Sequence, residues 1–314
     1  MKDKLFLVVP CYNEQEVLEE TAKRLKQKMS ALIEQNKISP DSRVVFVNDG
    51  SKDATWEMIV SLHHADPLFS GICLSRNRGH QNAVLAGLMT VREEADMVIS
   101  LDADLQDDID AIDEMVEKYY EGNDVVYGVR SGRKTDTGFK RGTAQGFYKL
   151  LSRMGVETVY NHADYRLMSR RALAALSEFK EVNLFLRGMV PLVGFKSAKV
   201  YYERKERFAG ESKYPLSKMI GLAVDGITSL SVKPIRFLAG LGGVLLAVGL
   251  VTSLVFFIRW LTGFEVTGAF AAFLCVWVFG SLNLLALGVI GEYVGKTYLE
   301  TKHRPRFIIE EYLK

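Results

Sequence analysis

Short apolar runs alternate with amphipathic helical patterns through the first 130 residues. Runs of strand length lie at 5–10, 43–48, 71–75, 97–102 and 125–128. The segments between them place apolar residues at helical spacing. Strands separated by helices of this length predict an α/β fold with a mostly parallel sheet and crossover helices.

Two much longer apolar stretches follow in the last third of the chain. Residues 237–258 and 266–291 contain no charged residue, and each exceeds the roughly 18 to 20 residues that a membrane-spanning helix needs. The link between them is short, so we expect a transmembrane hairpin. Residues 215–232 carry apolar side chains along one helical face, which predicts a helix lying in the bilayer interface.

This pattern divides the chain into four parts. We expect a cytoplasmic catalytic domain at 1–214, the interfacial helix at 215–232, the hairpin at 233–296 and a cytoplasmic tail at 297–314 that runs back along the catalytic domain. Basic residues concentrate at the two outer ends of the hairpin: Lys233, Arg236, Lys296, Lys302, Arg304 and Arg306. In the link between the two spans, Arg259 is the only basic residue. The positive-inside rule therefore places both termini in the cytoplasm, with two helices crossing the plasma membrane.

Composition narrows the classes of function. The chain has 40 Lys and Arg against 38 Asp and Glu, a net charge of +2, which argues against nucleic acid as a partner. The three cysteines have no metal-binding or redox spacing. Small residues recur in the hairpin at Ala239, Gly243 and Ala247. They favour tight helix packing within the hairpin or between protomers, and we expect a homo-oligomer.

Polar and charged residues follow every predicted strand. These segments lie at 10–14, 48–51, 75–79, 102–104 and 128–130. Ligands of parallel sheets gather at the carboxyl ends of the strands, so all five segments can border one site.

Asp102 and Asp104 stand one residue apart where the fourth run ends. In an extended segment such residues project to the same side. Their oxygens suit a hard cation, Mg²⁺ or Mn²⁺, which takes further ligands from water and a phosphorylated substrate. A solvated turn with Asp as helix N-cap is the simpler alternative for an isolated Asp-x-Asp. The other polar strand ends favour a metal site.

Four motifs carry a family resemblance. They are Val-Pro-Cys-Tyr-Asn-Glu at 9–14, Val-Asn-Asp-Gly-Ser-Lys-Asp at 47–53, Ser-Arg-Asn-Arg-Gly-His at 75–80 and Leu-Asp-Ala-Asp-Leu-Gln-Asp at 101–107. In this order they resemble the signatures of family-two inverting glycosyltransferases with the GT-A (Rossmann-like) fold. The chain is similar in particular to the polyprenyl-phosphate glycosyltransferases, which include dolichyl-phosphate mannose synthase and bacterial undecaprenyl-phosphate sugar transferases.

The resemblance assigns roles to individual residues. It implies that the metal and diphosphate are held by Asp102 and Asp104, and that the nucleotide of a sugar donor is held by Pro10, Tyr12, Glu14 and Asp49. It also implies that Arg130 and Arg141, in a basic loop rich in glycine, bind the acceptor phosphate. A merely solvated surface is the alternative for that loop.

Two further assignments come with alternatives. The resemblance casts Asp164 as catalytic base, but a phosphate monoester has its second pKa near 6 and is largely dianionic at neutral pH. Asp164 could therefore orient the acceptor or the sugar hydroxyls instead. Arg207, Ser212 and Lys213 precede the membrane region, where they could close over a phosphate group or contact lipid headgroups.

The predicted activity is inverting transfer of a sugar from a nucleotide-sugar donor to undecaprenyl phosphate at the cytoplasmic membrane face. We favour UDP-glucose, with UDP-N-acetylglucosamine or UDP-N-acetylgalactosamine next. A separate flippase and a downstream glycosyltransferase would then decorate a surface polymer. A processive polysaccharide synthase is disfavoured, because Arg is followed by Trp only at 259–260, inside the membrane link. A transporter component that only binds nucleotide or lipid is the second alternative, although two helices offer no obvious path.

Overall fold

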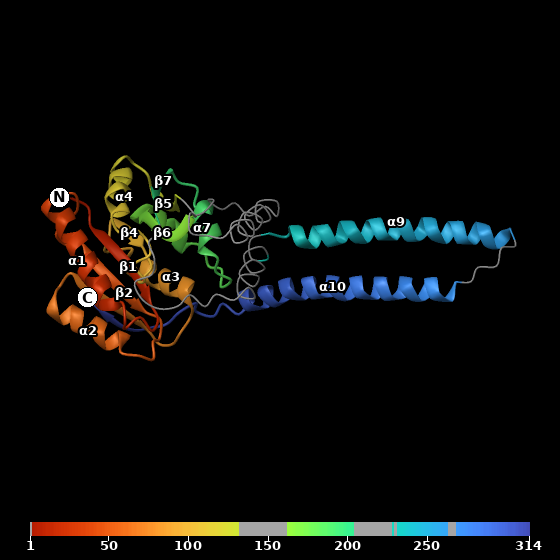
Figure 1. The fold of residues 1–314 in the computed structure, drawn as a ribbon, viewed down its shortest axis with the longest axis horizontal. Helices are drawn as coiled ribbons and strands as arrows, with labels where there is room; N and C mark the ends of the chain where they lie inside the picture. The colour runs from red at the N-terminus through yellow and green to blue at the C-terminus, as the bar shows by residue number, and fades with distance from the viewer. Residues whose placement is uncertain (1, 132–161, 204–227, 229–230, 263–267) are drawn as a thin grey trace.

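The apolar runs form the strands of one mixed sheet (Figure 1). The computed structural model describes residues 2–131, 162–203, 228, 231–262 and 268–314. In this part of the chain the strands are β1 (Leu5–Cys11), β2 (Arg43–Asn48), β3 (Phe69–Leu74), β4 (Met97–Ser100), β5 (Val125–Arg130), β6 (His162–Ser169), β7 (Ser197–Tyr202) and β8 (Ile309–Leu313). Their order across the sheet is β7-β5-β6-β4-β1-β2-β3-β8.

The helices are α1 (Leu18–Glu34), α2 (Thr55–Ala65), α3 (His80–Val91), α4 (Ala111–Tyr120), α6 (Arg170–Ser177), α7 (Leu186–Leu192), α9 (Lys233–Leu261) and α10 (Ala269–Thr301). Strands β1, β2, β3 and β4 pair in parallel, as do β5 and β7. The predicted α/β fold with a mostly parallel sheet is therefore confirmed.

Helices cover both faces of the sheet. Leu5, Leu7 and Val9 of β1 pack into one core cluster with α1 and α4, whereas Phe6 and Val8 pack into a second cluster with α3 and α6. A strand that is buried on both faces needs a continuous apolar run rather than alternation, which is the pattern that the sequence shows at 5–9.

Strand β6 departs from the sequence prediction, which gave no strand at 162–169. It lies antiparallel between β4 and β5, so these two strands are not neighbours. Its sequence mixes buried apolar residues with Asp164 and Arg166, so it lacks the apolar run that marked the other strands. Its place in the sheet carries Asp164 to the end of β4, where the Ser100 hydroxyl donates to the Asp164 carbonyl at 2.6 Å.

The two long helices extend away from the sheet side by side (Figure 1). Helix α9 has 29 residues and α10 has 33, and large apolar side chains such as Val244, Val276 and Leu284 are exposed on them. By length and composition, one segment of the described residues, Val278–Thr301, is a candidate membrane span. This segment overlaps the predicted span at 266–291, whereas the predicted span at 237–258, and with it the hairpin, stays a prediction. Nearly all of the predicted interfacial helix lies outside the described residues.

The chain returns to the sheet after α10. Strand β8 pairs antiparallel with β3, and the Arg306 guanidinium donates to the Phe179 carbonyl at 2.9 Å. The tail thus covers the edge of the sheet beside β3 with a strand that the sequence analysis did not predict.

Candidate active site

The Asp102–Asp104 segment lies at the carboxyl end of β4, between the ends of its neighbours. The strand ends at Ser100, so Asp104 lies in a turn, and strand alternation is not what relates the two carboxylates. The turn is closed by the Gln106 amide, which donates to Asp104 Oδ1 at 3.2 Å. Its residue Leu105 has a φ of 57°, a left-handed conformation that is uncommon outside glycine.

Negative charge accumulates around Asp102. Burial raises the pKa of Asp102 to about 6, and the charges of Asp107, Asp164 and Asp104 add to this while that of His80 opposes it. The described residues contain no cluster of three or more side chains that could hold a metal ion. Two carboxylates that repel one another nevertheless fit Mg²⁺ or Mn²⁺, which keep waters and take substrate oxygens as their other ligands.

Two arginine side chains donate hydrogen bonds to the carboxylate of Asp164. It receives a hydrogen bond of 2.6 Å from Arg166 Nη2, and two more of 3.2 and 3.0 Å from Arg187 Nε and Nη2. Burial alone would raise the pKa of Asp164, but Arg187, His80 and Arg166 outweigh it and hold the pKa well below its usual range. Asp164 is thus a permanent anion at neutral pH, and a weak proton acceptor.

His80 joins the two carboxylate groups. It begins α3, and its Nε2 atom lies 3.5 Å from Asp102 Oδ1 and 3.6 Å from Asp164 Oδ2. Burial would lower the pKa of His80, but Asp164 and Asp102 raise it above its usual value. The sequence interpretation gave no role to His80, Arg166 or Arg187. The sequence did contain a signal for His80, which stands at the end of the 75–80 motif. Arg187 lies in α7, and the sequence argument considered only segments that follow strands.

Arg130 lies on the same edge, at the end of β5. Its Nη2 atom lies 3.4 Å from Asp107 Oδ1, and the Tyr202 hydroxyl donates to that oxygen at 2.6 Å. The charge of Arg187 acts on Arg130, and that of Asp107 acts on Asp102. Arg130 therefore borders the acidic cluster, and its binding of the acceptor phosphate stays a prediction. Arg141, Arg207, Ser212 and Lys213 lie outside the described residues.

The predicted nucleotide residues lie in loops that hold one another. Asp49 is buried, and its carboxylate accepts from the amides of Arg78 at 2.7 Å and Gly79 at 2.9 Å. The Glu14 amide donates to Thr55 Oγ1 at 3.0 Å, and Tyr12 is exposed. In this structure Asp49 fixes the loop that leads to His80. Direct contact of Pro10, Tyr12, Glu14 and Asp49 with a nucleotide stays a prediction.

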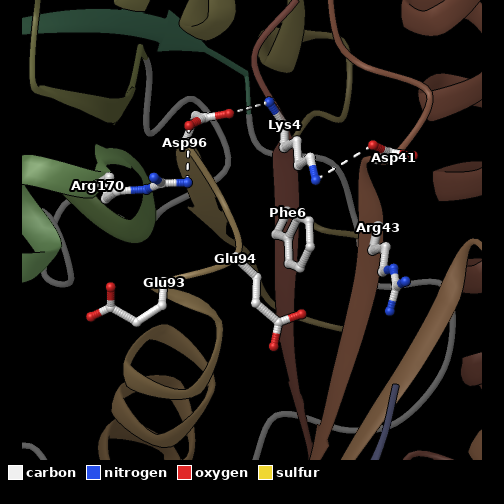
Figure 2. A pocket seen from close by; sticks show the side chains of 8 residues that line it. All are labelled: Lys4, Phe6, Asp41, Arg43, Glu93, Glu94, Asp96 and Arg170. Atoms are coloured by element: carbon white, nitrogen blue, oxygen red, sulfur yellow. Dashed lines mark hydrogen bonds and ion pairs between the residues drawn. The ribbon is translucent and has the colours of Figure 1, made fainter.

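A hollow of about 600 Å³ lies at the opposite, amino end of the strands (Figure 2). Its charges are largely matched: Lys4 pairs with Asp41 at 3.4 Å, and Arg170 pairs with Asp96 at 3.0 Å. The hollow also lies away from the loops that carry the motifs. It is therefore not the site that the sequence motifs define.

Comparison with known proteins identifies the family to which this chain belongs. A model of glycosyl transferase family 2 matches residues 6–177. The uncharacterized glycosyltransferase YkoT of Bacillus subtilis (strain 168) is 50% identical over 306 residues, 98% of this chain and 91% of that protein. The bactoprenol glucosyl transferase of Shigella phage SfV is 38% identical over 316 residues, 98% of each chain.

Among solved structures, mannosyl-3-phosphoglycerate synthase from Rubrobacter xylanophilus has a TM-score of 0.49 and 15% identity over 74% of each chain. The family match and the near full-length relatives place this chain in glycosyltransferase family 2. The resemblance inferred from the motifs is confirmed, and membership of this family supports glycosyltransferase activity for the chain.

Proposed function

We propose that the protein transfers a sugar from a nucleotide-sugar donor to the phosphate of a membrane polyprenyl lipid, with inversion at the anomeric carbon. The observation that carries this proposal is the cluster of Asp102, Asp164, His80 and Arg187 in a chain that continues into exposed apolar helices. A transferase that reached only soluble acceptors would have no need of those helices. Relatives named bactoprenol glucosyl transferase support a polyprenyl phosphate as the acceptor and glucose as the sugar.

Asp102 and Asp104 are the residues that would hold Mg²⁺ or Mn²⁺ against the donor diphosphate. The bound ion would act as a Lewis acid that neutralises charge developing on the leaving group. Burial is the main cause of the raised pKa of Asp102, and the charges of Asp107, Asp164 and Asp104 add to it. A bound cation would favour the ionised carboxylate. Tyr12, Glu14 and the loops held by Asp49 would receive the nucleotide.

Asp164 serves as an orienting anion in this proposal rather than as a base. Its lowered pKa makes it a poor proton acceptor, and the acceptor phosphate already carries its nucleophilic charge. Asp164 would fix the guanidinium of Arg187, whose side chain is 41% exposed, for contact with a phosphate group. Arg130 would add a second guanidinium, and planar guanidinium groups bind phosphate through paired hydrogen bonds.

The membrane part of the proposal uses α9 and α10 as two spanning helices, with the catalytic domain in the cytoplasm. Anchoring the enzyme beside its lipid acceptor keeps the headgroup near the site, so that transfer gains from proximity. The product would face the cytoplasm, and its use in a surface polymer would need a separate flippase and a later transferase.

A donor screen with purified protein tests the proposal. UDP-glucose, UDP-N-acetylglucosamine and UDP-N-acetylgalactosamine would each be incubated with undecaprenyl phosphate and Mg²⁺ or Mn²⁺. We expect an organic-soluble, mild-acid-labile product, formed fastest from UDP-glucose. Faster transfer from an N-acetylhexosamine donor would change the assigned sugar. Nucleotide binding without product from any donor would favour a non-catalytic binding component.

A further inference from the structure

The cytoplasmic end of α10 is docked on the segment that leads into α7. The carboxylate of Glu300, in the last turn of α10, accepts hydrogen bonds from the Val182 amide at 2.8 Å, the Asn183 amide at 2.8 Å and the Asn183 side-chain amide at 2.6 Å. The same side-chain amide lies 3.3 Å from the Lys296 carbonyl. One membrane-helix carboxylate thus holds two consecutive backbone amides of the catalytic domain.

The docked residues 182–183 lie a few positions before Arg187, which contacts Asp164. The Leu186 amide donates to Gln81 Oε1 at 2.8 Å, and the Leu186 carbonyl accepts from Arg166 Nη1 at 3.3 Å. The next residue is Arg187, which donates twice to Asp164. The segment is therefore fixed at one end by Glu300 and at the other by the charged groups of the site.

Helix stability does not explain the position of Glu300. A carboxylate in the last turn of a helix opposes the helix dipole, which favours cations at that end. Its three accepted hydrogen bonds involve a charged acceptor, and such bonds are stronger than those between neutral groups. The Glu300 carboxylate thus accepts its three hydrogen bonds from the 182–183 segment, and its charge also acts on Arg306 of the tail.

We propose that Glu300 is a positioning residue for sugar transfer: by fixing residues 182–183 on the end of α10, it places Arg187 against Asp164. This inference rests on the proposed function. It gives the membrane helix a second task beyond anchoring, because the geometry of the transfer site then depends on how α10 is seated. Other contacts hold the nucleotide loops at 10–14 and 48–53, such as the bond from the Glu14 amide to Thr55 Oγ1, so we expect donor binding to depend on this segment less than transfer does.

The substitution Glu300→Gln tests the role. Glutamine keeps the shape but turns an amide donor toward the donors of residues 182–183. We expect kcat to fall by about tenfold to a hundredfold, the range that a misplacement of about 1 Å can produce. Affinity for UDP, measured by calorimetry on the full chain, should stay at the wild-type value. Glu310→Gln is the matched control, because Glu310 is an exposed carboxylate on the next strand of the same tail.

A double-mutant cycle with Arg187→Ala separates positioning from general loss of structure. If Glu300 acts through Arg187, then Glu300→Gln should cause no further loss of kcat in a protein that already lacks Arg187. Multiplied losses in the double variant, or wild-type kcat for Glu300→Gln, would overturn the role of Glu300. Asn183→Ala, which removes one of the three hydrogen bonds, should show a smaller loss in the same direction. A wild-type protein that transfers no sugar would instead contradict the proposed function.

Discussion

Replacing Asp164 with asparagine should impair stability and transfer together. The side chain of Arg166 is almost completely buried, with 1% of its surface exposed. The side chain of Asp164 is 14% exposed. Asp164→Asn removes the negative charge that compensates Arg166 and also loses part of the hydrogen bonding to Arg187. It leaves a buried cation without its anion, while the volume of the side chain hardly changes.

The size of the effect follows from this burial. Removing one partner of a buried ion pair costs about 3–5 kcal/mol, and asparagine retains one acceptor, so we expect the lower end of that range. For a domain of this size each kcal/mol lowers Tm by about 2–4 °C, which gives a fall of roughly 6–12 °C.

The pH dependence has a defined sign. The pKa of Asp164 is depressed in the folded protein, so its stabilising contribution is present above the unfolded value of about 3.9 and is lost as pH falls through the folded pKa. The difference in Tm between wild type and variant should therefore shrink in strong acid. It should also shrink as pH rises through the raised pKa of His80, because Asp164 then no longer faces a protonated imidazole.

Thermal unfolding in detergent, followed by intrinsic fluorescence, measures the stability difference, and transfer is assayed below both midpoints. Asp41→Asn is the control, because Asp41 is 72% exposed in its pair with Lys4 and such surface pairs contribute about 0–1 kcal/mol. An Asp164→Asn protein with the Tm and kcat of wild type would refute both the buried pair and the orienting role.

Three further predictions concern the metal ligands and two close backbone approaches. Mn²⁺ affinity should fall by about tenfold per pH unit below about 6, because protonation of Asp102, whose pKa is raised to about 6, competes with the metal; titration calorimetry that finds constant affinity down to pH 5 would contradict this. Gly50→Ala should weaken UDP binding, because Gly50 has a φ of 63° and an added Cβ would lie 2.5 Å from the Asn77 amide nitrogen; wild-type UDP affinity would show that the loop tolerates the change. Gly87→Ala should destabilise the protein by about 1–3 kcal/mol through overpacking, because its Cβ would lie 2.4 Å from Val8 Cγ1; urea unfolding would detect the loss, and an unchanged midpoint would show that α3 can shift.

Local periodicity was enough to predict most of the sheet. The runs at 5–10 and 43–48 form β1 and β2 because continuous apolar segments of that length are buried on both faces of a parallel sheet. Strands β6 and β8 could not be found in this way. Their pairings with β4 and β3 join residues far apart in the chain, and such pairing leaves no periodic trace in the sequence.

The site was predictable where it depends on strand ends, and not where it depends on tertiary packing. Asp102 and Arg130 could be located because parallel strands end at one edge. The position of Arg187 depends on how α7 packs beside β6, and the dock at Glu300 depends on how the end of α10 meets residues 182–183. The neighbours of Asp164 also depend on tertiary packing: two guanidinium groups and His80 lower the pKa of its carboxyl and make it a weaker proton acceptor than a free carboxylate.

In the proposed reaction, Asp102 and Asp104 hold a metal for sugar transfer to a lipid phosphate. The most direct test compares wild type and Asp104→Asn for transfer of labelled glucose from UDP-glucose to undecaprenyl phosphate, at limiting Mn²⁺. We expect label in an organic-soluble, mild-acid-labile product with the wild type, and almost none with a variant that folds with the same Tm. Full activity of a well-folded Asp104→Asn protein at limiting metal would contradict the metal assignment, and no lipid-linked label from the wild type with any donor would contradict the proposed transfer itself.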